Sequence, residues 1–248
     1  MFVHRAETKE AALALIRAGS NDCEVARRLG VARSTVRDWR APRYIAKSAM
    51  TCPRCWRGVR RAFGFTEADY TELLGLYLGD GYIARTGRSD RLRLFLDTRY
   101  ARIVDEAVAL LERSFPGRPV GRVPAHGGTM TVVSLYCTHL RCLFPQHGPG
   151  KKHERPIVLE RWQRMLLERE PWPFLRGCIR SDGCVFVNRT GKYAYLSYDF
   201  KNRSADILGL FTVACELVGV EYRRYAGHVR IYRRASVALM QAEVGLKE

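Results

Sequence analysis

Apolar residues recur at helical spacing in the first forty positions and are interrupted by turn residues. One helix is predicted over Ala6–Ala18, where Gly19 ends the pattern. A second is predicted over Asp22–Leu29, because Ser20, Asn21 and Asp22 offer an N-cap and Gly30 breaks the run. A third is predicted over Ser34–Arg40, before Pro42. The pattern therefore predicts a small all-helical segment at the start of the chain.

The turn between the second and third helices is informative. Ala26 supplies a small residue where two helices touch, Gly30 suits a left-handed turn, and Val31, Val36 and Trp39 follow at helical spacing. The run EVARRLGVARSTVRDWR resembles the helix-turn-helix family. That resemblance places Arg33, Ser34, Thr35, Arg37 and Arg40 toward the major groove or its phosphates. The alternative is an ordinary helical hairpin with a solvated basic face.

The rest of the chain contains an internal repeat. Residues 73–81 and 175–183 share the pattern L-x-G-x-x-x-small-D-G, with Asp80 and Asp182 separated by 102 positions. Strand-like runs over residues 91–97 and 193–199 follow, ending in aspartates that lie 17 positions after Asp80 and Asp182. Helical stretches are predicted over 100–115 and 204–218, and further strands over 130–136 and 228–232. Each copy ends in Gly-x-Lys, at Lys152 and Lys247.

These matched elements predict two copies of one α+β unit, joined by a linker helix near Leu159–Leu167. The resulting domain organisation is a helix-turn-helix domain over 1–45, a linker with a C-x-x-C over 46–65, a first repeat over 66–156 and a second over 157–248.

The net charge of the chain indicates which class of partner it binds. The chain carries 42 Lys and Arg against 25 Asp and Glu, a net charge of +17, and a surplus of this size favours a polyanion such as nucleic acid. No basic amphipathic helix with a clean apolar face, signal peptide or membrane-spanning run is found, so no membrane partner is expected. Eight scattered cysteines indicate reduced thiols, and a cytoplasmic, nucleoid-associated location is expected.

The two repeated motifs resemble the LAGLIDADG signature of homing endonucleases, and the resemblance covers roughly residues 66–248. It implies two pseudo-symmetric αββαββα repeats that form a DNA-binding saddle, an overall α+β fold preceded by the all-α domain. It also implies a monomer bound to double-stranded DNA, since one chain supplies both halves. Arg176 and Arg180 put charge into the second signature helix, and we expect them to point away from the helix interface.

The signature helices suggest a metal site. Small residues on both facing stripes, at Gly75, Gly79, Gly177 and Ser181, would let two helix backbones approach closely. Asp80 and Asp182 would then meet at adjacent helix ends, where a shared Mg²⁺ relieves their repulsion and supports phosphodiester hydrolysis. The plain alternative is a pair of Asp-Gly turns that end two helices.

Basic residues surround this predicted site. By repeat alignment and by the resemblance, Lys152 and Lys247 are catalytic candidates, with Lys151 as the alternate in the first copy and a surface role as the alternative for each. Strand alternation would turn some basic residues toward DNA; the candidates are Arg91, Arg93, Lys192, Lys201, Arg230 and Arg233. The aromatic residues Tyr82, Phe95, Tyr195 and Tyr198 are expected in the core or in sheet packing.

A second metal is suggested by Cys52-Pro53-Arg54-Cys55, because a C-x-x-C can supply two of the four ligands of a Zn²⁺ ion. No second C-x-x-C exists, so the other donors would come from elsewhere, with Cys137, His139, Cys142 and His147 as candidates. The alternative is a pair of free thiols in a loop.

Three functions compete on these observations. The first is a sequence-specific, Mg²⁺-dependent endonuclease of double-stranded DNA. The second is a non-cleaving transcription regulator that uses the same surfaces for binding. The third is a nucleic-acid-binding module of a larger assembly, with zinc at Cys52 and Cys55.

Overall fold

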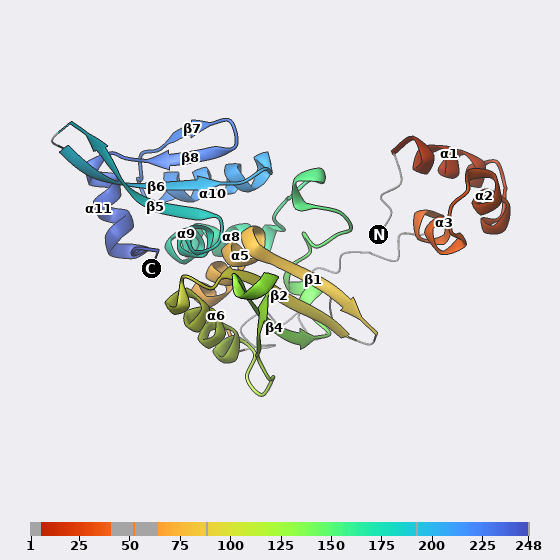
Figure 1. The fold of residues 1–248 in the computed structure, drawn as a ribbon, viewed down its shortest axis with the longest axis horizontal. Coiled ribbons are helices and arrows are strands. Elements are labelled where there is room, and N and C mark those ends of the chain that lie inside the picture. Colours follow the sequence, from red (N-terminus) through yellow and green to blue (C-terminus); the bar gives the residue numbers. More distant parts are fainter. Residues whose placement is uncertain (1–5, 41–51, 53–63, 88, 192, 248) are drawn as a thin grey trace. The chain divides into compact units, whose positions relative to one another are not determined.

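The computed structural model describes residues 6–40, 52, 64–87, 89–191 and 193–247 (Figure 1). The chain divides into two compact units, Met1–Ile45 and Ala46–Glu248. Two of the predicted site residues, Cys55 and Lys192, lie outside the described residues.

The first unit holds the three expected helices, α1 (Ala6–Arg17), α2 (Asp22–Leu29) and α3 (Arg33–Arg40). Asn21 and Glu24 form a capping box that fixes the start of α2. Gly30 follows α2 with φ 63°, a left-handed conformation that glycine adopts without steric cost. The small core of this unit consists of Ala12, Val25, Val31 and Val36, with Trp39 packed against it.

The second unit contains the duplication. The first copy runs through α5 (Glu67–Asp80), β1 (Gly81–Thr86), β2 (Ser89–Asp97), α6 (Ala101–Ser114), β3 (Gly121–Ala125), β4 (Met130–Cys137) and α7 (Leu140–Leu143). The linker helix α8 (Arg161–Arg169) follows. The second copy runs through α9 (Pro171–Arg180), β5 (Gly183–Thr190), β6 (Tyr193–Lys201), α10 (Ala205–Leu217), β7 (Arg223–Tyr225), β8 (His228–Ile231) and α11 (Arg234–Glu243). Both copies have the expected αββαββα order.

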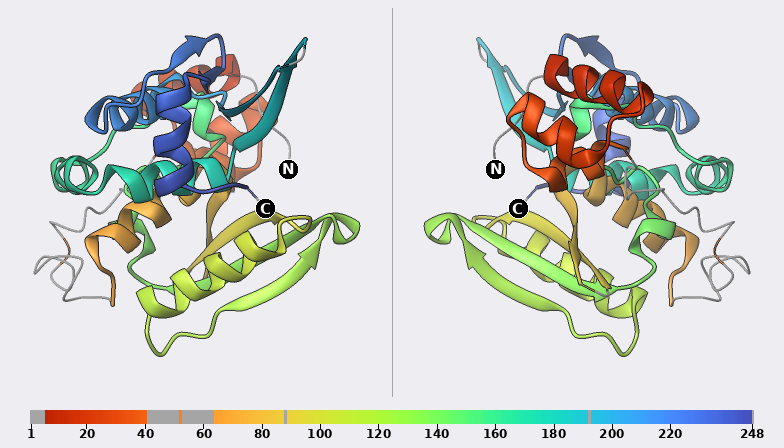
Figure 2. Two further views of the ribbon diagram at one scale, coloured as in Figure 1. Left: turned by 90° about the vertical axis from the view of Figure 1, so that its left-hand side faces the viewer. Right: turned by 90° about the vertical axis from the view of Figure 1, so that its right-hand side faces the viewer.

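Each copy builds one antiparallel sheet, in the orders β1-β2-β4-β3 and β5-β6-β8-β7. Burial alternates along β2, so that Leu92, Leu94 and Leu96 lie in the core and the residues between them do not. Helix α6 covers this apolar face of the first sheet, and α10 and α11 pack on the second sheet (Figure 2). In the described part of the second unit, the opposite face of each sheet, the helix-free face, carries exposed side chains such as Tyr82 and Tyr195.

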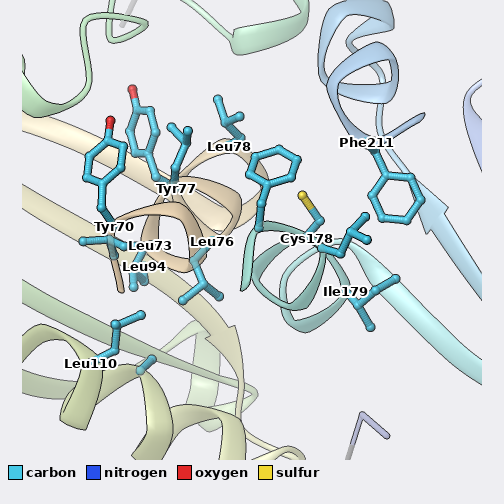
Figure 3. Packing of buried hydrophobic residues seen from close by; sticks show 14 of the residues in the cluster. Tyr70, Leu73, Leu76, Tyr77, Leu78, Leu94, Leu110, Cys178, Ile179 and Phe211 are labelled. Carbon is cyan, nitrogen blue, oxygen red and sulfur yellow. The ribbon is translucent and has the colours of Figure 1, made fainter. Parts of the chain in front are cut away.

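The two copies share one hydrophobic core, which contains buried residues of both. Helices α5 and α9 lie side by side at its centre, and Figure 3 shows Leu76 and Leu78 on α5, Cys178 on α9, and Ile179 on the side of α9 that is nearer to Phe211. A buried polar chain links α8 to the first copy, since Gln163 donates to the Tyr70 hydroxyl (2.7 Å) and Tyr70 donates to the Leu143 carbonyl (2.6 Å). The seam between α5 and α9 is thus part of the shared hydrophobic core.

Two aromatic residues that were expected in the core or in sheet packing are not in the core. Tyr82 and Tyr195 are each 49% exposed, because both lie on the helix-free face of their sheet. Tyr198 is buried as expected. Among the residues that the structure describes, no helix combines the length and the apolar character needed to cross a membrane.

Candidate functional site

The contact between α5 and α9 is close enough to exclude side chains. A Cβ atom built on Gly177 would lie 2.1 Å from the Glu72 carbonyl oxygen, and one built on Gly75 would lie 2.5 Å from the Phe174 carbonyl oxygen. One built on Gly79 would lie 2.1 Å from the Ser181 Oγ. The four small residues singled out in the sequence therefore lie at the helix contact, and backbone meets backbone there.

This approach brings two acidic residues to the same end of the seam. Asp80 is the last residue of α5, and Asp182 follows α9 by two positions. The Asp182 Oδ2 lies only 3.3 Å from the Cβ position of Gly79, the neighbour of Asp80. Asn202, at the end of β6, donates to Asp182 Oδ2 at 2.7 Å. Asn202 belongs to no repeated motif, so the sequence reading missed it.

Two lysines hold the ends of these helices. The Lys152 ammonium donates to the carbonyls of Tyr77 (2.5 Å), Leu78 (2.9 Å) and Gly79 (2.8 Å) at the end of α5. The Lys247 ammonium donates to the carbonyls of Ser181 (2.5 Å) and Gly183 (2.8 Å), just beyond α9. Both lysines therefore satisfy helix-end carbonyls and place a positive charge beside the carboxylates. Lys151 is exposed and pairs with Glu154.

The electrostatics of the four groups are coupled. Burial, followed by repulsion from Asp182, raises the pKa of Asp80 to about 7, against the attraction of Lys247 and Lys152. Burial also raises the pKa of Asp182, and Lys152 and Asn202 oppose that shift. Burial lowers the pKa of Lys152 to about 8 and lowers the pKa of Lys247, although both aspartates oppose these shifts. The pKa values of both carboxyls are therefore raised. A bound cation would offset the cost of ionising them.

Arg176 and Arg180 of α9 were expected to point away from the helix interface. That expectation is wrong, because both contact α5. Arg180 donates to Glu72 of α5 and pairs with Glu106 at 2.6 Å. Arg176 lies 3.5 Å from the same Glu72 carboxylate. Glu72 is only 6% exposed, so it is a buried acid paired with two arginines. The charged side chains therefore join the two copies.

A basic cleft opens beside Asp182. It encloses about 480 Å³ and includes Gly79 of α5 and Gly227 of the β7–β8 turn in its walls. Its basic lining residues are Lys151, Lys152, Lys201 and Arg203. Asp182 is the acidic residue of the lining. A cleft with this composition suits a phosphate group next to a carboxylate.

The helix-free faces of the sheets carry arginines over aromatic rings. Arg91 lies 5.3 Å from the Tyr136 ring centroid and Arg93 lies 4.8 Å from that of Phe95. In the second sheet Arg230 lies 5.5 Å from the Phe186 centroid and pairs with Asp199 at 3.2 Å. Within the described part of the chain, the Nε atom of each of these three arginines lacks a hydrogen-bond partner. These Nε atoms are themselves buried, and the Nη2 atoms of Arg91 and Arg230 donate to the Ser134 hydroxyl (2.8 Å) and to Asp199 (3.2 Å).

The basic residues of α3 fall into two groups. Arg33 and Arg37 are exposed, and Thr35 is partly buried. Arg40, by contrast, lies 2.6 Å from Asp22 and donates to the Ser20 carbonyl at 2.7 Å. Arg40 therefore links α3 to the start of α2, while Arg33 and Arg37 extend into solvent.

Three of the predicted zinc donors come together in the second unit. The ligand atoms of Cys52, His139 and Cys142 all lie within 4.8 Å of one another. Of the other candidates, Cys137 accepts a hydrogen bond from the His139 N–H (3.4 Å), and His147 packs at the edge of the Tyr82 ring. Burial lowers the pKa of His147 to about 4, so this imidazole is neutral.

Comparison with known proteins gives results for both units. Residues 4–41 match the family model of a homeodomain-like domain. A search of curated proteins with the whole chain found no match.

Solved structures resemble the duplicated unit. The N-terminal LAGLIDADG domain of WhiA shares 14% identity, with 77% of this chain and 89% of that chain covered and a TM-score of 0.49. The homing endonuclease I-DmoI, crystallised with DNA and Mn, also shares 14% identity, with 72% and 97% covered and a TM-score of 0.49. At such identities the likeness concerns the fold alone. The chain thus resembles LAGLIDADG proteins in its duplicated unit and a homeodomain-like domain in residues 4–41.

Proposed function

We propose that this chain binds double-stranded DNA at specific sequences and hydrolyses phosphodiester bonds with a divalent cation held by Asp80 and Asp182. One observation carries the proposal. Two carboxylates, one from each copy of a duplicated unit, are brought to the same end of a seam where backbone meets backbone, and burial and their mutual repulsion raise the pKa of Asp80 to about 7.

The donor set suits Mg²⁺. Carboxylate oxygens are hard ligands, and Mg²⁺ takes one or two of them together with water and phosphate oxygens. A bound divalent cation would supply Lewis-acid chemistry, acidifying a water and stabilising negative charge on phosphate oxygens. The amide of Asn202 donates to Asp182 Oδ2 and would orient this carboxylate for the role. Asp80 and Asp182 would therefore bind the metal at the end of the seam between α5 and α9.

The chain's own cations would position the substrate. Lys201 and Arg203 line the cleft beside Asp182 and would bind the phosphate backbone. Lys152 and Lys247 donate to helix-end carbonyls and keep positive charge beside the carboxylates. They would favour the ionised, metal-binding form of the aspartates and stabilise charge that develops on the scissile phosphate.

Sequence would be read on the helix-free sheet faces and on α3. Arg91, Arg93 and Arg230 are partly exposed, and their guanidinium groups would contact DNA phosphates or the O6 and N7 acceptors of guanine in the major groove. Arg33 and Arg37 would add contacts from the first unit. Because one chain supplies both carboxylates, we expect it to act as a monomer, with one subunit per DNA site.

A non-cleaving DNA-binding regulator is the second candidate, and one observation favours it. The three protons of the Lys152 ammonium meet three backbone carbonyls, which is the arrangement of a structural residue. The same binding surfaces would then serve without hydrolysis. The two candidates differ in what Mg²⁺ does to bound DNA.

The test is a randomised duplex library incubated with the full-length chain and Mg²⁺, followed by separate sequencing of bound and cut molecules. Specific cut ends are expected, and Asp80→Asn combined with Asp182→Asn should abolish them and leave binding intact. Asp105→Asn, which removes an exposed carboxylate paired with Arg122, serves as the control and should cut normally. Bound but uncut DNA for the wild-type chain supports the regulator, and cutting by the double variant refutes the proposed site.

A further inference from the structure

A thiol-imidazole cluster lies in the second unit and shares no residue with the site at Asp80 and Asp182. Cys52 and Cys142 are buried, His139 is partly buried, and their ligand atoms all lie within 4.8 Å of one another. The Cys52 Sγ is 3.3 Å from the His139 Nδ1. Cys52 precedes His139 by 87 positions, so the fold, and not local sequence, brings the two side chains together.

A tight turn prepares two of the three donors. His139 precedes the short helix α7, and its carbonyl accepts from the N–H groups of Cys142 (3.0 Å) and Leu143 (3.1 Å). The spacing of three residues puts His139 and Cys142 on one side of this turn. Trp162 of α8 packs against Cys52 and Cys142 and supplies an apolar wall. The donors are thus held before any ligand binds.

Two thiols and an imidazole form the donor set that Zn²⁺ prefers. Zinc binds thiolate sulfur at ~2.3 Å and imidazole nitrogen at ~2.1 Å in a tetrahedron, so such ligands lie about 3.6 Å apart. The observed distance between the Cys52 Sγ and the His139 Nδ1 is a few tenths of an ångström shorter than that edge. The soft donors disfavour Mg²⁺ and Ca²⁺, which take oxygen ligands.

We propose that Cys52, His139 and Cys142 bind a structural zinc ion. Cys55 completes the C-x-x-C spacing in the sequence but lies outside the described residues, and the proposal rests on the three described donors. The first unit ends at Ile45. The ion would link Cys52, which follows that unit in the sequence, to His139 and Cys142, which follow β4 of the first repeat. Metal binding at such a site contributes directly to folding free energy.

The experiment measures metal on the full-length chain, purified under reducing conditions. Elemental analysis should find one zinc per chain, and replacement by Co²⁺ should give the sulfur-to-cobalt charge-transfer absorption of thiolate ligands. Cys52→Ala, His139→Ala and Cys142→Ala should each lose most of the zinc. Cys215→Ala removes a buried thiol from α10, outside the cluster, and should keep it.

The proposal can be tested even if a variant fails to fold, because the Co²⁺ spectrum and the zinc content are also measured on the wild-type chain. Chelation of that chain should lower its thermal midpoint, and added Zn²⁺ should restore it. A wild-type chain that binds no zinc even after addition of Zn²⁺, or variants that keep a full equivalent, would overturn the proposal. The double variant Asp80→Asn with Asp182→Asn should retain zinc, which separates this site from the proposed nuclease.

Discussion

At the residue scale, Asp80 has competing neighbours. Burial and Asp182 disfavour its ionised form, while Lys247 and Lys152 favour it, and the result is a pKa of about 7 against an ordinary value of 3.8. Such a carboxyl is half ionised near neutral pH in the metal-free chain. Its ionisation costs the folded state free energy that a bound cation would return.

This cost has a predictable sign. The folded chain holds a proton on Asp80 between pH 4 and pH 7, where the unfolded chain does not, so the contribution of Asp80 to the unfolding free energy of the metal-free protein falls as pH rises through that window. Asp80→Asn removes the titrating group. In urea titrations with chelator, the variant should equal the wild type near pH 4 and exceed it by about 4 kcal/mol at pH 8.

Adding Mg²⁺ at pH 8 should reverse that order, because only the wild type gains stability from binding the ion. Asp105→Asn should follow the wild type under both conditions, since its carboxylate pairs with Arg122 on the surface. A metal-free Asp80→Asn chain that is less stable than the wild type at pH 8 would show that Asp80 is not a strained carboxylate.

Lys152 and Lys151 are adjacent in the sequence and differ in their surroundings. Lys152 is buried against α5 and lowers the pKa of both aspartates, whereas Lys151 is exposed and pairs with Glu154. Lys152→Met should therefore raise the pKa of both carboxyls and increase the number of protons that Mg²⁺ binding releases at pH 7. Lys151→Met should leave it nearly unchanged. Calorimetric titration measures both, and the opposite ranking would make Lys151 the functional lysine of the first copy.

At the element scale, the close contact between α5 and α9 depends on glycine residues, which have no side chain to keep the helices apart. A methyl group at Gly177 would meet the Glu72 carbonyl oxygen at 2.1 Å, and backbone cannot turn aside as a flexible side chain can. Gly209, within α10, is a helical glycine with no atom within 4 Å of the position that a methyl group would occupy. The two positions form a matched pair.

Gly177→Ala should destabilise the chain by about 3 kcal/mol, because the two helices must separate. Gly209→Ala should stabilise it by about 0.5 kcal/mol, because alanine is the better helix former. Denaturant unfolding of both variants measures the difference. Equal effects at the two positions would mean that the helices tolerate separation, and the carboxylates would then not be held together by the seam.

The helix and strand pattern was largely predictable, and the reason is physical. Period-3.6 and period-2 patterns survive in the sequence wherever one face is buried, so α2 and the duplicated order of elements could be predicted from it. Short edge strands leave a weaker trace: β3 contains Pro124 and β7 has only three residues. Such strands form because a neighbouring strand pairs with them.

The site was less predictable where partners come from distant elements. A charge in a helix seam looks unfavourable, so the sequence alone favours Arg176 and Arg180 facing away, whereas Glu72 of α5 supplies their buried partner. Asn202 carries no repeated signal, because its counterpart position in the first copy is Tyr100. Exposed Tyr82 and Tyr195 reflect a sheet with one face free of helices, which alternation alone does not reveal.

At the scale of the whole molecule, the proposed DNA contacts come from both units, whereas the proposed metal site belongs to the second unit alone. Asp80 and Asp182 belong to the second unit, while Arg33 and Arg37 extend from α3 of the first. If the first unit contributes only binding, its arginines should affect how tightly DNA is held without affecting how fast bound DNA is cut. This separation can be tested in the full-length chain.

Arg33→Ala combined with Arg37→Ala should weaken binding of the target duplex by roughly tenfold or more and reduce the salt dependence of binding by about two ions, if both side chains contact phosphates. Cutting at saturating protein should be unchanged, because the carboxylates and lysines of the second unit remain. Lys9→Ala combined with Arg17→Ala removes the same charge from exposed positions on α1 and is the control. Equal weakening by both pairs would mean that net charge alone drives binding. Loss of cutting at saturation would mean that α3 helps to align the scissile phosphate, which would make the two units one catalytic assembly.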